Sequence, residues 1–307
     1  MAMPAIVQMA EEEVCVAGEE SLAAGTREGG PQRCGLLIER AKTYSMMKRF
    51  DEAIADLTEV LRLDPGNDIV WSRRGELYRR TGRFQEAVAD FDRAIEIDPE
   101  YAYAIGSRGQ AYEALGRFGE ALADFDRAVE LTPDEVWLLS ERADLLRKVE
   151  RYEDAETDLS RAVMLAPEDT DLYNARGDLY YQVNRYDDAI TDFSHALSME
   201  PNNVWALVSR GETYRMMDKV DEGLGDLNHA LQLEPDNDRA LGSRGAILHE
   251  LHRDEEAVVD LTRAIEIDPE YTWAYVRRGE VLRSLGRYEE SLVDINRAME
   301  LDGGADG

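Results

Sequence analysis

Apolar and small residues return along the chain with a period of 34 residues. Within one period, large apolar residues stand at helical spacing, as Tyr78, Phe84, Phe91 and Ile95 do. A proline closes most periods, and it ends a helix because it disfavours helical geometry in the residue before it. A period in this range predicts a stack of helix–turn–helix units. The prolines that mark it are Pro65, Pro99, Pro133, Pro167, Pro201, Pro235 and Pro269.

The period divides residues 34–303 into eight repeats. Their eighth place is Ala or Gly throughout, as at Gly75, and such small residues let two antiparallel helices approach closely. Residues 1–33 are rich in Glu and Gly without a sustained apolar period, so we expect a mostly disordered acidic tail, with a short helix or binding segment over 6–16 as the alternative. Residues 304–307 are expected to be a flexible end. The repeats are 34–67, 68–101, 102–135, 136–169, 170–203, 204–237, 238–271 and 272–303.

A family pattern is visible in the second repeat and recurs with variation over residues 34–303. It consists of Trp71, Arg74, Gly75, Tyr78, Ala87, Phe91, Ala94 and Pro99. This pattern resembles the tetratricopeptide repeat (TPR) family. The resemblance implies an all-α, right-handed superhelical solenoid of antiparallel helix pairs, whose first helices line a concave groove. It identifies no partner, because one fold hosts many functions.

The composition is strongly acidic. Among 307 residues, 65 are Asp or Glu and 35 are Lys or Arg, which gives a formal net charge of −30. This charge repels nucleic acid and anionic membranes, and it favours a basic or mixed-charge protein or peptide. No apolar run reaches the length of a membrane span. Residues 1–10 lack a signal-like start, and two cysteines give no disulfide framework, so we expect a cytoplasmic protein.

Two columns of opposite charge run through all eight repeats. Arg fills the seventh place, which is usually apolar in the TPR family, and Asp fills the twenty-third. We predict a ladder of ion pairs between the two helices of each repeat, with ligand contact by some arginines as the alternative. A second basic column, from Arg49 to Arg287, falls in the turns and is expected to be solvated. The ladder consists of Arg40, Arg74, Arg108, Arg142, Arg176, Arg210, Arg244 and Arg278, with Asp56, Asp90, Asp124, Asp158, Asp192, Asp226, Asp260 and Asp294.

The resemblance places the second, fifth, ninth, twelfth and thirteenth residues of each repeat on the groove. Three of the four tryptophans stand at the second place. They either anchor a partner or pack against the neighbouring helix. Glu and Arg three residues apart also have the spacing to pair along one helix. The candidate partner-binding residues are Ile69, Glu76, Arg79, Tyr103, Trp137, Asp144, Arg147, Asn174, Asp178, Tyr181, Trp205, Glu212, Arg215, Trp273, Glu280 and Arg283.

Signals for chemistry are weak. His249 and His252 have a spacing that could place two imidazoles on one helical face, near Asp254 and Glu255, but no Cys completes a zinc site. No pair of carboxylates is marked as an acid and a base. We therefore expect no catalytic residue, no metal and no cofactor.

These observations favour a scaffold or adaptor that binds a peptide or protein segment in its groove. One alternative is a self-assembling homodimer that forms through the C-terminal repeat. That repeat keeps apolar residues such as Leu292, Val293, Ile295 and Met299 with no further repeat after it, so a second copy, a partner or the 1–33 tail could cover them. A minor alternative is an enzyme with its active site in the groove.

Overall fold

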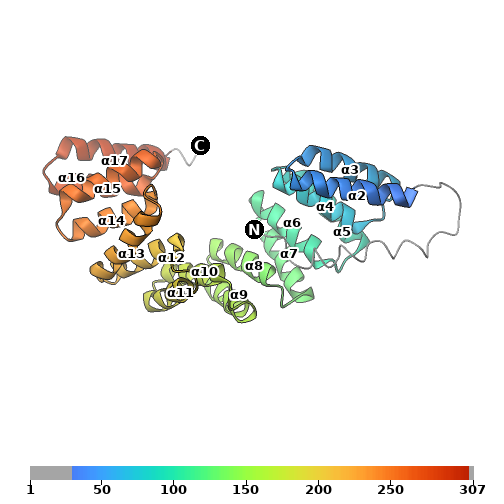
Figure 1. Cartoon of the computed structure of the whole chain (residues 1–307), viewed down its shortest axis with the longest axis horizontal. Helices are drawn as coiled ribbons and strands as arrows, with labels where there is room; N and C mark the ends of the chain where they lie inside the picture. The colour runs from blue at the N-terminus through green and yellow to red at the C-terminus, as the bar shows by residue number, and fades with distance from the viewer. Residues whose placement is uncertain (1–29, 304–307) are drawn as a thin grey trace. The chain divides into compact units, whose positions relative to one another are not determined.

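The structure is a computed structural model that describes residues 30–303. The described residues form sixteen α-helices and no strand (Figure 1). Each predicted repeat is one helical hairpin. In chain order the helices are α2 Gly30–Met46, α3 Phe50–Leu63, α4 Asp68–Arg80, α5 Phe84–Ile97, α6 Ala102–Ala114, α7 Phe118–Leu131, α8 Val136–Lys148, α9 Tyr152–Leu165, α10 Thr170–Gln182, α11 Tyr186–Met199, α12 Val204–Met216, α13 Val220–Leu233, α14 Asp238–Glu250, α15 Asp254–Ile267, α16 Thr272–Ser284 and α17 Tyr288–Gly303.

One predicted boundary is wrong. The helix α2 begins at Gly30 rather than Cys34, so residues 30–33 belong to the first hairpin and not to the tail. Proline in a first turn is compatible with a helix, because the first N–H groups have no partner within the helix anyway. The predictions for residues 1–29, including the short helix over 6–16, and for 304–307 lie outside the described residues.

The helices form two compact halves, Met1–Leu165 with α2–α9 and Ala166–Gly307 with α10–α17. Within each half, the hairpins stack in chain order. The second helix of one hairpin packs on the first helix of the next, as α3 does on α4 and α11 does on α12. The fold is therefore an all-α repeat solenoid.

Small residues allow the close packing inside each hairpin. A Cβ atom at Gly75 in α4 would lie 3.0 Å from Cε1 of Phe91 in α5. Phe91 and its neighbours Ala87 and Ala94 are fully buried in this joint. The eighth place is Ala or Gly because the two helices leave no room there for a larger side chain.

The turn inside each hairpin has one fixed geometry. The backbone at the fifteenth place is left-handed in every repeat, with φ between 58° and 74°. The next N–H returns to a carbonyl of the first helix, as Arg83 N does to Tyr78 O over 2.8 Å, which closes that helix. The left-handed residues are Lys48, Gly82, Gly116, Glu150, Asn184, Asp218, His252 and Gly286.

Candidate functional site

The predicted ion-pair ladder is confirmed in all eight repeats. Each seventh-place Arg donates from Nε and Nη2 to both carboxylate oxygens of the Asp sixteen residues later, over 2.6–2.9 Å. In Arg142, this bond to Asp158 raises the pKa of the guanidinium. Paired bonds of this kind hold both side chains in one orientation.

Most of these arginines also connect neighbouring repeats. The Nη1 atom donates to the twenty-fifth place of the preceding repeat, sixteen residues earlier. Arg74 reaches Thr58 over 2.9 Å, and Arg142 reaches Asp126 over 3.0 Å. Since Nε, Nη1 and Nη2 are all engaged, these guanidinium groups hold the fold together. The further pairs of this kind are Arg108 with Asp92, Arg210 with Ser194, Arg244 with Asn228 and Arg278 with Thr262.

The second basic column is exposed, as predicted. Arg83 and Arg151 each pair with an acidic residue three places later, Glu86 and Asp154, and all four side chains are 43–54% exposed. Such pairs contribute little to stability. The turn column therefore belongs to the surface.

In the N-terminal half, the candidate residues mostly bind one another. Glu76 pairs with Arg79 over 2.8 Å, and Arg147 reaches Asp144 over 3.4 Å. The ring of Tyr103 lies 5.7 Å from that of Trp137. The predicted site residue Ile69 is half-buried on α4.

Trp137 packs against the preceding repeat. A Cβ atom at Gly106 would lie 2.7 Å from Cη2 of Trp137 and 2.4 Å from Cδ2 of Leu138. The indole therefore occupies the space that the glycine leaves. Trp273 repeats this arrangement over Gly242, where a Cβ atom would lie 3.1 Å from the ring.

Sequence reasoning missed Glu141, at the sixth place of α8. Burial raises the pKa of its carboxyl, and the nearby carboxylates of Asp144 and Glu113 act in the same direction. Glu113 itself is bound by Lys148 over 2.5 Å. The sixth place carries no inward assignment in the family pattern, so the sequence offered no signal for this residue.

In the C-terminal half, Trp205 is the candidate with the most accessible ring, at 49% exposed. Its Nε1 donates to Oδ2 of Asp178 over 3.1 Å, and the guanidinium of Arg239 lies 4.4 Å from the ring centroid. Three consecutive first helices, α10, α12 and α14, thus hold one indole. Arg239 stands at the second place of its repeat, which the family pattern marks as inward, so it could have been included among the candidate residues from the sequence.

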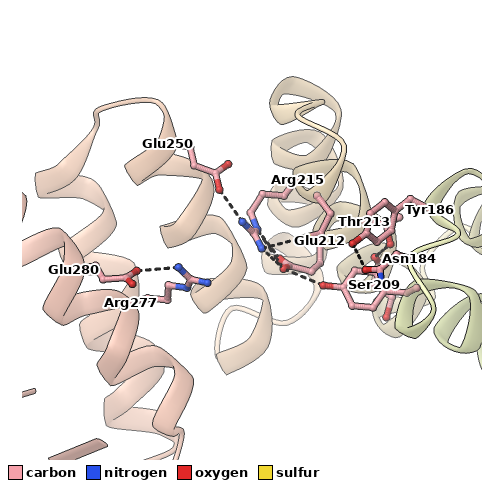
Figure 2. Close-up of polar contacts among 11 residues, drawn as sticks. Asn184, Tyr186, Ser209, Glu212, Thr213, Arg215, Glu250, Arg277 and Glu280 are labelled. Carbon is pink, nitrogen blue, oxygen red and sulfur yellow. Dashed lines mark hydrogen bonds and ion pairs between the residues drawn. The ribbon is translucent and has the colours of Figure 1, made fainter. Parts of the chain in front are cut away.

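A polar network lies on the same three helices (Figure 2). Arg215 donates to Glu212 over 2.6 Å and to Glu250 over 2.7 Å. The hydroxyl of Tyr181 donates to Glu212 over 3.4 Å, and burial, with the Glu212 charge, raises the pKa of this tyrosine to about 12. Arg215 therefore pairs with Glu212 in its own helix, as the spacing predicts, and also with Glu250 in α14. Glu250 fills the thirteenth place, which the family pattern marks as inward.

The remaining candidates lie at both ends of this half. Trp273 stacks on Tyr271 at 5.8 Å. Glu280 pairs with Arg277 over 2.9 Å rather than with Arg283, which is exposed, so the expected pairing of Glu280 along its helix runs in the other direction (Figure 2). Asn174 is buried on α10, with no hydrogen-bond partner for its Oδ1 in the described part of the chain.

The suggested pair of imidazoles does not share a helical face. His252 lies in the left-handed turn after α14, and Nδ1 of His249 lies 2.6 Å from Oδ1 of Asp254. Over residues 30–303, no group of three His, Cys, Asp or Glu side chains is arranged to hold a metal ion. In the same range, no helix combines the length and apolar character needed to span a membrane.

The repeat solenoid and its hairpin pattern define a class of protein that binds other proteins. Models described as tetratricopeptide repeat match residues 39–102, 75–148, 238–271 and 274–304, and one described as TPR repeat matches 177–218. The chain belongs to the tetratricopeptide repeat family. It therefore has the fold of a protein–protein interaction scaffold.

Solved structures agree with this fold. A tetratricopeptide repeat protein from Parabacteroides merdae is 20% identical with a TM-score of 0.65, over 82% of this chain and 99% of that one. YrrB, described as a TPR protein with an unusual peptide-binding site, is 24% identical with a TM-score of 0.52, over 60% and 95%. The APC/C hetero-tetramer Cut9–Hcn1 is 18% identical with a TM-score of 0.60, over 83% and 57%. No curated protein matches the chain.

Proposed function

We propose that this protein is a scaffold that binds a peptide segment on the first helices of its C-terminal half, with Trp205 as the anchor. The observation that carries the proposal is the unequal burial of three equivalent tryptophans. Trp137 and Trp273 pack over glycines, whereas the repeat before Trp205 has Asn174 at that place, and the indole stays half exposed. A large exposed aromatic among polar groups is a typical binding hot spot.

The charges around Trp205 favour a mixed-charge peptide. The carboxylate of Asp178 lies beside the indole and favours a cation of the peptide, while the guanidinium of Arg239 favours an anion. The excess of acidic residues over the whole chain shifts the preference toward basic segments. The peptide-binding site named for YrrB supports this use of the fold by analogy. We propose no reaction, no nucleic-acid or membrane partner and no cofactor, and a cytoplasmic location stays a prediction.

The test begins with capture of a partner and continues with its peptide in calorimetry. Trp205→Ala should raise Kd at least tenfold, because it removes the anchor. The matched control is Phe118→Ala, which removes an aromatic side chain of similar exposure from a second helix of the other half. Added salt should weaken binding through screening. An unchanged Kd for Trp205→Ala would refute the anchor.

Self-association is a second candidate, because one observation favours it. Leu292 and Met299 on α17 are both largely exposed, whereas the equivalents of Met299 in the other repeats are buried and the apolar equivalents of Leu292 are at least half-buried. An exposed apolar patch of this kind is typical of an interface. The C-terminal repeat thus provides a surface for a second copy.

A further inference from the structure

The first and last described helices expose residues that are buried at the same places elsewhere. Met299, at the twenty-eighth place of the last repeat, is 66% exposed, and its equivalents within the two halves are 5–9% exposed. Leu36, at the third place of the first repeat, is 73% exposed, and its equivalents within the two halves are 0–1% exposed. The equivalents of Met299 are Leu61, Ile95, Val129, Leu197, Leu231 and Ile265, and those of Leu36 are Val70, Ala104, Leu138, Ala206, Ala240 and Ala274.

The joint between α3 and α4 shows what covers these places inside the stack. Leu61 of α3 and Val70 of α4 belong to one buried cluster, together with Ile54, Leu57 and Leu77. The twenty-eighth place of one repeat and the third place of the next therefore share a core. Met299 and Leu36 occupy these two places at opposite ends of the chain, so each exposes one side of the contact that is buried between α3 and α4.

The polar part of the joint is also divided between the two ends. Inside the stack, Nη1 of Arg244 donates to Oδ1 of Asn228 in the preceding repeat over 2.9 Å. At the open ends, Asn296 stands exposed at the place of Asn228, and Arg40 stands at the place of Arg244. The Arg40 side chain is 58% exposed, against 13–26% for the other seven ladder arginines. Its Nε and Nη2 bind Asp56, as in every repeat.

The charges of the two end helices are complementary, although the whole chain is acidic. The helix α2 carries three basic residues and one acidic residue, whereas α17 carries five acidic residues and one basic residue. The internal joint has the same signs, with an excess of acidic residues on α3 and of basic residues on α4. Complementary faces guide two molecules into one register.

We infer that the outer face of α17 in one molecule binds the outer face of α2 in a second molecule, in the packing that joins α3 to α4. Met299 then meets Leu36, and Arg40 donates to Asn296. This contact is head-to-tail, so each bound copy leaves another free end, and open chains of copies form. The inference rests on the self-association candidate and is independent of peptide binding at Trp205.

Sedimentation over a concentration series tests this contact with Leu36→Glu and Met299→Glu. Both positions are exposed, so the variants should fold, and circular dichroism checks this. The wild-type mass should rise steadily with concentration, and each variant should weaken association at least tenfold by placing a charge in an apolar joint. The matched control is Val293→Glu, since Val293 is 67% exposed and its internal equivalent Val259 is 66% exposed, outside the joint.

An equal mixture of the two variants gives the decisive result. The unchanged α17 face of Leu36→Glu should bind the unchanged α2 face of Met299→Glu. The other face of each molecule carries the substitution and is blocked, so the product is a dimer and nothing longer. A monomeric wild type at all concentrations would overturn the inference, and so would an undisturbed mass for Leu36→Glu or a mixture that stays monomeric. Loss of peptide binding in Trp205→Ala with unchanged sedimentation would leave this contact untouched.

Discussion

Most seventh-place arginines hydrogen-bond both to their own repeat and to the repeat before, where an apolar side chain would only make packing contacts. Arg142 binds both oxygens of Asp158 within its repeat and reaches Asp126 in the repeat before. Burying such a pair brings a desolvation cost that offsets much of its attraction. The pair therefore specifies register between helices more than it adds net stability, and a lysine could not reproduce its planar geometry.

Removing one partner should be far worse than removing both. Arg142→Ala leaves Asp158 buried without a counter-charge, and we expect a loss of up to about 3–5 kcal/mol in the free energy of unfolding. The double variant with Asp158→Ala should recover part of that loss. Urea unfolding measures both, and Arg151→Ala in the exposed turn column is the control, with little expected change. Strictly additive losses would show that the two side chains do not interact.

The half-buried carboxyl of Glu141 should make stability depend on pH. Burial raises its pKa in the folded state, so the folded protein binds its proton more tightly than the unfolded chain does. Stability from this group therefore falls as pH rises from the ordinary value of 4.5 through the raised one. Glu141→Gln, which keeps an acceptor for Gln110, should melt higher than wild type at pH 7. The gap should close near pH 4, and a constant gap from pH 4 to pH 7 would contradict this assignment.

Some recurring positions were easier to predict from the sequence than others. The Arg–Asp ladder was predictable because a charge of each sign recurs in every repeat, and only two facing columns fit such a pattern. The burial of the three second-place tryptophans was not predictable, although all three share that place. It is decided by the fifth place of the preceding repeat, where Gly106 and Gly242 make room and Asn174 does not.

At the scale of the helix, the turn inside each hairpin limits stability in a way that sequence choice can change. Glycine adopts the left-handed backbone without strain, while other residues adopt it at a cost of roughly 1–2 kcal/mol. Five of the eight repeats place a larger residue there, among them Glu150 after α8. Because all eight repeats share this turn geometry, the five repeats without glycine carry the conformational cost of the left-handed backbone.

Glu150→Gly should therefore stabilise the protein by about 0.5–1 kcal/mol, after the greater freedom of glycine in the unfolded chain is subtracted. Thermal unfolding measures the gain. The reciprocal change, Gly116→Ala, should lower the melting temperature. A Cβ atom at Gly116 meets no atom within 4 Å, so its effect comes from the backbone alone. A neutral or destabilising Glu150→Gly would mean that its side chain makes a contact worth more than the strain.

Helix positions followed from the sequence except at the first helix. The period fixes where each hairpin begins, because the small residues must face one another. The start of α2 at Gly30 was missed because glycine and proline read as a break, although both are compatible with a first turn. Glycine and proline usually mark the end of a helix, but their effect depends on their position, and in a first turn they are tolerated.

At the scale of the whole molecule, the period determines the number of repeats but not what the stack binds. The same apolar place is buried inside the stack and exposed on its last described helix, as Leu61 and Met299 show. Exposure depends on neighbours, so it could be measured only in the structure. The acidic excess, in contrast, is plain in the sequence and acts on every repeat.

This excess should make the folded state less stable at low ionic strength. Carboxylates outnumber basic groups, 65 to 35, and folding brings them closer together. Raising sodium chloride from about 10 mM to about 100 mM shortens the screening length from ~30 Å to ~10 Å, which weakens this repulsion. The ladder pairs are mostly buried and lose little, and the exposed turn pairs contribute little to begin with. The melting temperature should therefore rise by a few degrees, on the order of the ~2–4 °C that 1 kcal/mol gives a domain of this size.

Circular dichroism at low micromolar concentration separates the effect from self-association, and chloride is preferred to sulfate, whose exclusion from the surface stabilises most proteins. A melting temperature that falls over this range would show that favourable ion pairs outweigh the repulsion.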